Sequence, residues 1–262
     1  MGNEDWVTGN IRLSLGGEPL ELQMTVPAKP VKPQKMLPIF QQMTNSFVGM
    51  AENAVGNAGG QISCQKGCGA CCRQAIPLAE IEAYKIAEMV EDLPEPRRTE
   101  IKNRFAAAWH HFSQIGWFER LDNCANLSHE EREKVVLEYF HEGVPCPFLE
   151  NESCSIHLER PLACREYIVT SPAENCSKLT AEGIRMVELS VKPSDTIRKI
   201  TNSDNLNKSV NFVPLVLALE WVKINADEFP EKTGEQWVAE FFTKLTRKEI
   251  PKKDESGRLK EE

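Results

Sequence analysis

The sequence predicts a mainly α protein of the α+β class, with helices around an irregular, cysteine-rich metal-binding segment and a small N-terminal β-hairpin. Apolar residues alternate with polar ones near the start of the chain, and they recur at helical spacing through most of the rest. Nine cysteines lie between positions 64 and 176. The chain has 262 residues, of which 41% are hydrophobic, which suits one large globular domain or two small ones.

Changes in composition along the chain divide it into four segments. The N-terminal β-hairpin and a proline-rich linker occupy residues 1–38, and a cysteine-cluster metal-binding domain follows over 39–180. We expect residues 181–246 to form a helical extension packed on that domain. Residues 247–262 are dense in charge, which is typical of a disordered tail.

The hairpin is predicted over residues 6–26. Ile11, Leu13 and Leu15 alternate with polar residues, and a second alternating run extends to Val26. Gly16-Gly17 lies between the two runs and permits a turn with positive φ. Four prolines between positions 27 and 38 then predict a stiff, extended linker.

Most of the remaining elements are predicted to be helices. Prolines at 94 and 96 separate two of them, and Ser128 with Glu131 has the spacing of a capping box, as has Thr233 with Gln236. Glu80 and Glu82 are expected to be solvated helix residues. The expected helices span 38–56, 78–92, 98–118, 129–141, 213–225 and 234–246, with a strand over 184–191 and a loop-rich segment over 143–177.

The composition excludes several classes of protein. A net charge of −8 and a pI of about 5.4 argue against nucleic acid as the main partner. No apolar run approaches the roughly 20 residues of a membrane span, and no secretory signal is visible, so we expect a cytoplasmic protein. An odd number of cysteines without an export signal does not suit a disulfide framework. Clustered thiols in a reducing compartment are more often metal ligands or redox groups.

The cysteines form two groups. The first group spells C-x3-C-x2-C-C over residues 64–72, where Gly67 and Gly69 allow a tight turn. The second group has spacings of seven, nine and eleven residues and needs a loop to return to the site. Cys124 lies far from both groups and is expected to be a small buried packing residue. The predicted metal ligands are Cys64, Cys68, Cys71, Cys72, Cys146, Cys154, Cys164 and Cys176.

This pattern resembles the YkgJ-type cysteine-cluster family, a zinc- or iron-chelating domain related to flagellin lysine N-methylases. The resemblance rests on the C-x3-C-x2-C-C run, on the CPFL segment from Cys146, and on the C-x-I-H-x2-R-P-x2-C-R string that begins at Cys154. It covers residues 64–176 and implies a metal site rather than a particular reaction. Many relatives are expected to have Tyr where this chain has His157, so the resemblance assigns that residue no role.

Eight thiolates exceed the four ligands of one tetrahedral zinc ion. Two ions, an iron–sulfur cluster plus an ion, or a multinuclear site would use them all. The Cα atoms of Cys71 and Cys72 are about 3.8 Å apart, so binding of both to one ion would be strained. All-thiolate sets hold both zinc and iron, including [4Fe–4S] clusters, and the single C-x2-C spacing slightly favours iron. Arg160 and Arg165 are predicted to offset the thiolate charge through hydrogen bonds to sulfur.

Three functions remain open from the sequence. The first is a metal-binding protein that chelates zinc or iron. The second is an enzyme that uses the same centre for methyl transfer or redox chemistry on an unidentified protein or other substrate. The third is a metal-stabilised interaction module. The C-x3-C-x2-C triplet also occurs in radical S-adenosylmethionine enzymes, but those have an aromatic residue where this chain has Ala70, and they continue in βα units.

Overall fold

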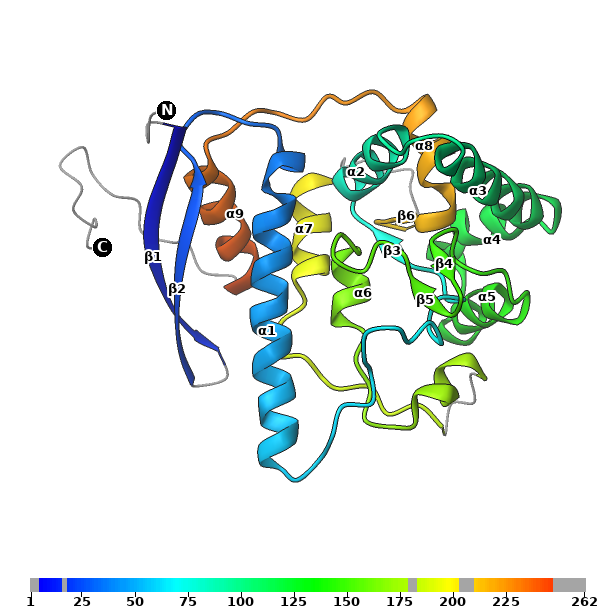
Figure 1. The fold of residues 1–262 in the computed structure, drawn as a ribbon, viewed down its shortest axis with the longest axis horizontal. Helices are drawn as coiled ribbons and strands as arrows, with labels where there is room; N and C mark the ends of the chain where they lie inside the picture. The colour runs from blue at the N-terminus through cyan, green and yellow to red at the C-terminus, as the bar shows by residue number, and fades with distance from the viewer. Residues whose placement is uncertain (1–4, 16–17, 179–182, 203–209, 247–262) are drawn as a thin grey trace.

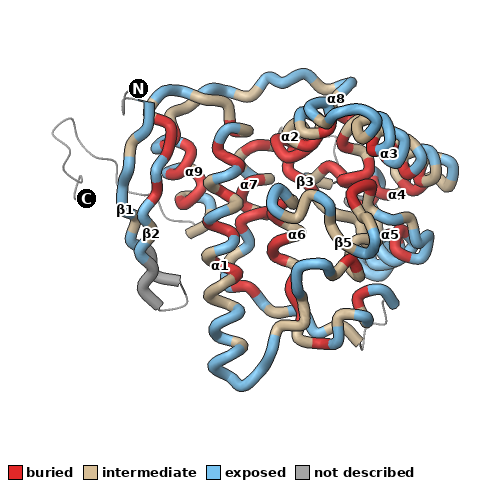
Figure 2. Tube along the Cα trace, viewed as in Figure 1, coloured by how far each residue is buried: buried red, intermediate tan, exposed pale blue. Residues whose placement is uncertain are grey.

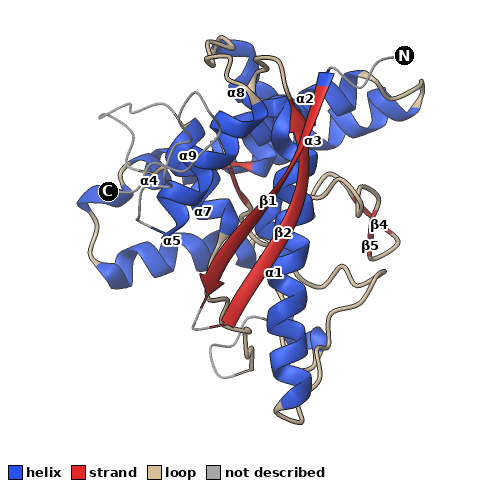
Figure 3. Cartoon of the chain, turned by 90° about the vertical axis from the view of Figure 1, so that its left-hand side faces the viewer, coloured by secondary structure: helices blue, strands red, loops and turns tan. Residues whose placement is uncertain are grey.

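The computed structural model describes residues 5–15, 18–178, 183–202 and 210–246. Its N-terminal element is the predicted antiparallel hairpin, β1 (Trp6–Leu15) with β2 (Glu18–Pro27), paired from Trp6 opposite Pro27 to Leu15 opposite Glu18. The Gly16-Gly17 turn and the charged tail at 247–262 lie outside the described residues. Figure 3 shows the hairpin lying across one side of the molecule, beside the long helix α1 (Leu37–Asn57).

Helix α1 is the central element of one half of the molecule (Figure 1). It follows a 3-10 turn, η2 (Pro33–Met36), formed by the proline-rich linker. It packs with α7 (Pro193–Thr201), α9 (Gly234–Thr246) and the inner face of β2 around a buried aromatic core. Thr233 and Gln236 cap α9 as predicted, with the Gln236 amide donating to Thr233 Oγ1 at 3.3 Å and the Thr233 amide donating to Gln236 Oε1 at 2.9 Å. The core includes Phe40, Trp237, Phe241 and Phe242.

The other half consists of the remaining helices. The hairpin-like pair α2 (Glu80–Glu91) and α3 (Arg97–Gln114) packs with α8 (Ala218–Ile224) and with a short sheet of β3 (Pro77–Leu78) and β6 (Val213–Pro214). A further cluster joins α3 to α4 (Trp117–Asp122), to the 3-10 turn η3 (Cys124–Asn126) and to α5 (His129–His141). None of the described helices is long and apolar enough to cross a lipid bilayer.

Several predicted elements differ from the observed ones. The expected helix over 98–118 ends at Gln114, because Gly116 adopts a left-handed conformation with φ of 66° and α4 begins after it. The helix expected over 213–225 begins only at Ala218, after β6 and the 3-10 turn η5 (Leu215–Leu217). Helix α7 was not predicted at all.

The prediction of a strand over 184–191 was wrong. Only an isolated bridge between Val169 and Met186 forms there, with the Val187 amide donating to the Ile168 carbonyl at 2.9 Å. The residues opposite are only a short extended stretch that follows a helix. They offer no partner strand with which residues 184–191 could form a longer ladder of backbone hydrogen bonds.

The loop-rich segment lies between the two halves (Figure 1). It contains only short elements: β4 (Leu149–Glu150), β5 (Ser153–Cys154), α6 (Leu162–Glu166) and the 3-10 turn η4 (Ala173–Ser177). Buried stretches run along α6 and along the neighbouring parts of α1 and α2, as Figure 2 shows. Helix α6 of this segment is therefore buried against helices from both halves, while the β4–β5 hairpin lies at the surface (Figure 3).

Two buried carboxylates hold α6 in place. Glu82 accepts the Ala79 amide at 2.9 Å and the Leu162 amide at 2.8 Å, so it joins the start of α2 to the start of α6. Glu166 accepts both the amide and the hydroxyl of Ser194, at 2.7 and 2.6 Å, and joins the end of α6 to the start of α7. Glu80 and Glu82 are thus buried, against the expectation that they are solvated.

We predict that Glu82→Gln lowers the free energy of unfolding by about 1–3 kcal/mol, because the amide can accept only one of the two backbone N–H groups and leaves the other unpaired. The matched control is Glu131→Gln, which alters the same capping contact, Ser128 amide to Glu131 at 2.8 Å, on the exposed helix α5. Denaturant unfolding followed by circular dichroism measures both. Equal, small losses of unfolding free energy in the two variants would show that burial of the Glu82 contacts adds nothing to stability.

Candidate metal centre

The two cysteine groups are joined through their backbones. The amide of Cys146 donates to the carbonyl of Cys72 at 2.7 Å, and the amide of Ser63 donates to the carbonyl of Val169 at 2.9 Å. Arg73 forms a two-pronged ion pair with Glu152, at 2.7 and 3.0 Å. The turn that carries the first group is therefore attached directly to the segment that carries the second.

Gly69 is the point of closest approach between the groups. A Cβ atom there would lie 2.5 Å from the carbonyl oxygen of Glu152 and 2.5 Å from Leu149 Cδ1. Asn151 and Glu152 form the two-residue turn between β4 and β5, both with positive φ, at 49° and 57°. This is the backbone of a type I′ hairpin turn, and it presents the Glu152 carbonyl to Gly69. The glycine that the sequence assigned to a tight turn is needed here for contact with another segment.

A cavity of about 410 Å³ lies where the groups meet. Residues from α1, from the first cysteine turn, from α6 and from the start of α7 line it. Cys176 is buried in η4 and is not among the lining residues, but Cys71 and Cys64 still raise its pKa. The thiols that line the cavity are those of Cys64, Cys68, Cys71, Cys72, Cys146, Cys154 and Cys164.

Cys71 is at the electrostatic centre of this group. A hydrogen bond with Cys72, followed by burial, raises its own pKa. In turn, Cys71 adds to the upward shift in the pKa of Cys146 and Cys154 from the second group. These effects act between members of the two groups, which line the same cavity.

Burial keeps the thiols protonated. It raises the pKa of Cys146 to about 12 and that of Cys176 to about 11. It raises the pKa of Cys164 well above the ordinary value, with Cys146, Cys71 and Cys154 adding to the shift. For these three thiols the neutral form is therefore favoured in the absence of a cation, because adjacent buried thiolates would repel one another.

The two arginines predicted at the centre have different surroundings. Arg160 lines the cavity, and its positive charge lowers the pKa of Cys64, Cys71 and Cys154 relative to what burial alone would give. Its Nε is buried and has no hydrogen-bond partner among the described residues. Arg165 is buried and donates to the carbonyls of Arg160 and Leu158 and to Asn45, so these contacts fix the backbone of the loop to α1.

Tyr167 is a site residue to which the sequence analysis gave no role. Its hydroxyl accepts from Gln74 Nε2 at 3.0 Å and hydrogen-bonds with Cys176, and burial raises its pKa to about 12. Its carbonyl lies 3.9 Å from Cys64 Sγ. The position of Tyr167 directly after the Cys164-Arg-Glu string was the only signal for it. His157 also lines the cavity, and burial, followed by Arg160, lowers its pKa, which favours the neutral imidazole that binds metals.

The thiols share a cavity without converging on one point. Within the described ranges, no group of three or more His, Cys, Asp or Glu side chains forms a ready-made ion site, and all nine cysteines are free. Cys124 is buried in the aromatic cluster beside α3 and α5 and is not a lining residue of the cavity. The eight-cysteine ligand set therefore stays a prediction, whereas seven of its members line one space.

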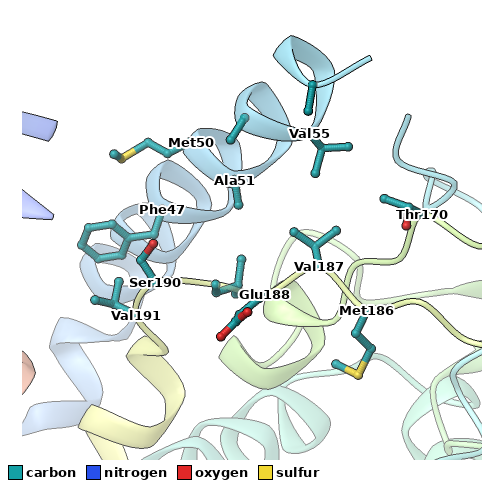
Figure 4. Close-up of a pocket in the computed structure, with 13 residues that line it drawn as sticks. Phe47, Met50, Ala51, Val55, Thr170, Met186, Val187, Glu188, Ser190 and Val191 are labelled. Atoms are coloured by element: carbon teal, nitrogen blue, oxygen red, sulfur yellow. The ribbon is translucent and has the colours of Figure 1, made fainter. Parts of the chain in front are cut away.

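A second hollow, of about 590 Å³, lies between the C-terminal half of α1 and residues 186–191 (Figure 4). Ala51 and Val55 of α1 point toward Val187 across it, and Phe47 lies beside Ser190 and Val191. Glu188 is the one ionisable side chain among its lining residues, and no thiol lines it. Its chemistry does not suit a metal.

Residues 63–184 match the family model described as "CxxCxxCC: Putative zinc- or iron-chelating domain". The matched segment includes all nine cysteines and covers slightly less than half of the chain. It confirms the resemblance of this segment to a cysteine-cluster family. No curated protein and no solved structure matched in the other two comparisons.

We predict that Gly69→Ala separates the two cysteine groups, because the added methyl group would overlap the Glu152 carbonyl and neither backbone can yield easily. Overpacking of this kind costs about 1–3 kcal/mol, and the thermal midpoint should fall. The control is Gly49→Ala in α1, where a Cβ meets nothing within 4 Å and helix propensity improves. A Gly69→Ala protein as stable as Gly49→Ala would show that the groups do not depend on this contact.

Proposed function

We propose that the protein binds zinc or iron through thiolates from both cysteine groups, at the cavity where the groups meet. The observation that carries this proposal is the gathering of seven thiols from residues 64–72 and 146–164 around one space. The family match supports metal binding in general. The choice of ligands, the metal and the number of ions are part of our proposal.

The residues suit such a group on chemical grounds. Zinc and iron both prefer thiolates, and a bound cation removes the repulsion that keeps the thiols protonated. Arg160 Nε, buried without a partner, gains an acceptor when the nearby sulfurs become thiolates. Since no ready-made ion site is present among the described residues, side chains must rotate inward when the metal binds. Their backbones are already in place.

Cys71 and Cys72 shape the proposed ligand set. They are adjacent and hydrogen-bonded to each other, and Cys71 interacts with more of the other thiols than any of its neighbours does. We assign Cys71 to the main site with Cys146, Cys154 and Cys164, and leave Cys72 for a second ion or for redox chemistry. Zinc supplies Lewis acidity at such a site, and iron supplies redox chemistry as well.

An enzyme is the second candidate function, and the cavity favours it over a purely structural site. Structural zinc sites are closed by their four ligands. Here the thiols border a space of about 410 Å³, within the size range of small-molecule sites, with room beside the sulfurs. The reducing environment that free thiols require is consistent with the cytoplasm, where we place the protein.

Cysteine substitutions test the ligand set. We expect Cys71→Ser and Cys164→Ser to lose at least half of the bound metal, measured by elemental analysis of anaerobically purified protein, since each removes a thiolate from the proposed main site. Cys124→Ser is the matched control because that residue lies in a separate apolar cluster, and it should keep its full metal content. Equal metal contents in all three variants, with the fold intact by circular dichroism, would exclude the cavity as the site.

Metal binding should also release protons. Because burial raises the pKa of Cys146 and Cys164, these thiols are protonated at pH 7 and must lose their protons to bind an ion. We expect about four protons per zinc ion held by four thiols, and an affinity that falls as the pH is lowered. Titration of metal-free protein with zinc in weakly buffered solution with a pH indicator measures the release. Fewer than about one proton per ion would show that carboxylates or histidines hold the metal.

A further inference from the structure

Two unpartnered guanidinium nitrogens lie at the proposed metal cavity. Among the described residues, three buried side-chain nitrogen or oxygen atoms have no hydrogen-bond partner, and two of these are Arg160 Nε and Arg198 Nη1. Both arginines line the cavity. Buried polar groups are normally satisfied, and an arginine cannot lose its proton to avoid the penalty. The unpartnered Nε of Arg160 is accounted for by the thiolates of the proposed metal site beside it, whereas Arg198 has no such neighbour.

Arg198 is held in position by its own helix. Its Nη2 pairs with Asp195, one turn earlier in α7, and its side chain is only 15% exposed. Burial raises the pKa of Glu82, and the charge of Arg198 offsets part of that rise; the two Glu82 oxygens are already occupied by backbone amides. The remaining nitrogen, Nη1, is buried and has no hydrogen-bond partner among the described residues, in a residue that lines the cavity.

The ionisable side chains that line the cavity include more cations than carboxylates, and Arg198 is not the only cation at its end of the cavity. Lys192, the residue before α7, lines it as well. Of the three lining carboxylates, Asp195 is paired with Arg198, and Glu166 is bound by Ser194, while Glu52 on α1 is exposed, as are Lys66 and Lys192. The lining therefore has one more cation than carboxylate, whereas the chain as a whole has a net charge of −8. The four lining cations are Lys66, Arg160, Lys192 and Arg198.

The walls between Arg198 and the thiols are largely apolar. They are formed by side chains from α1, from the residues before β3, from the loop after β5 and from η5. A ligand that fits this space has an apolar body and one anionic end. The apolar lining residues include Val48, Ile76, Pro77, Ile156, Ile168 and Leu215.

We propose that the cavity binds a small carboxylate with an apolar body, whose carboxylate pairs with Arg198 and Lys192 and whose body extends toward the thiols. This rests on the proposed function only in that the ligand lies beside the metal. A carboxylate suits this end better than a phosphate, because it carries one charge and takes two donors, whereas a phosphate needs more donors than one free guanidinium nitrogen and one ammonium supply.

The test uses full-length protein, as purified, with 3-phenylpropionate as the probe, and with 3-phenylpropionamide and inorganic phosphate as its comparisons. Isothermal titration calorimetry measures binding. We expect the carboxylate to bind at least about tenfold more tightly than the amide, the magnitude of one charge-assisted hydrogen bond. Inorganic phosphate should not displace it.

Arg198→Gln should weaken binding of 3-phenylpropionate at least about tenfold, and Arg198→Lys should restore part of the loss because the charge remains. Arg12→Gln is the matched control, since Arg12 pairs with Glu21 on the exposed hairpin and should not matter. If both Arg198 variants fail to fold, Lys192→Gln decides the question with an expected loss of several fold.

Equal affinity for the acid and the amide, or unchanged affinity in Lys192→Gln and in a folded Arg198→Gln, would overturn the proposal and leave Arg198 as an internal counter-charge for Glu82. Displacement by phosphate would replace the carboxylate with a general oxyanion. Metal content measured on the same samples separates this inference from the proposed function. Retained metal without carboxylate binding refutes the inference alone, and carboxylate binding to metal-free protein refutes only the dependence on the metal.

Discussion

The contact between Gly69 and the β4–β5 turn is the constraint on which the site depends. The two cysteine groups are far apart in sequence, and bringing them together costs the entropy of closing a long loop. That cost is reduced because the intervening chain folds into α2, α3, α4 and α5, which pack around their own aromatic residues. The Cys146 amide then donates to the Cys72 carbonyl. Gly69 lets the two backbones approach so closely because it has no side chain.

The clamps around α6 serve the same arrangement. This helix has five residues, too few to be stable alone, and it carries Cys164. Glu82 fixes its first amide to α2, and Glu166 fixes its end to α7. Both carboxylates are buried, with raised pKa values in which desolvation is the largest cause, about 7 for Glu166. Burial thus disfavours the charged form of these carboxylates, as it does for the thiols of Cys146 and Cys164.

Long periodic elements could be predicted from the sequence, and short ones could not. The hairpin and helices α1, α2, α5 and α9 have repeated apolar residues or capping pairs that specify their type. Helix α7 is short and mostly polar, and its buried face depends on neighbours from both halves. The sequence also could not distinguish the roles of two residues of the same type that lie close together in the chain. Arg160 lies beside the thiols, while Arg165 is occupied by backbone carbonyls, and only the path of the folded loop distinguishes them.

Most of the hydrophobic core of this fold lies outside the thiol cavity, which bears on what a metal would be for. Three hydrophobic clusters hold α1 with α9, α2 with α8, and α3 with α5, and a fourth, smaller cluster joins Val48, Ile168 and Leu189. Among the cysteines that line the cavity, Cys146 packs against the second cluster and Cys64 against the fourth, each as a partly buried neighbour. Small domains that need a metal to fold have no such cores, and their ions replace one. Here the helices enclose the site by their own packing and leave room beside the sulfurs. This arrangement supports our proposal of a site that binds a ligand beside the metal over one in which the metal only holds the chain together.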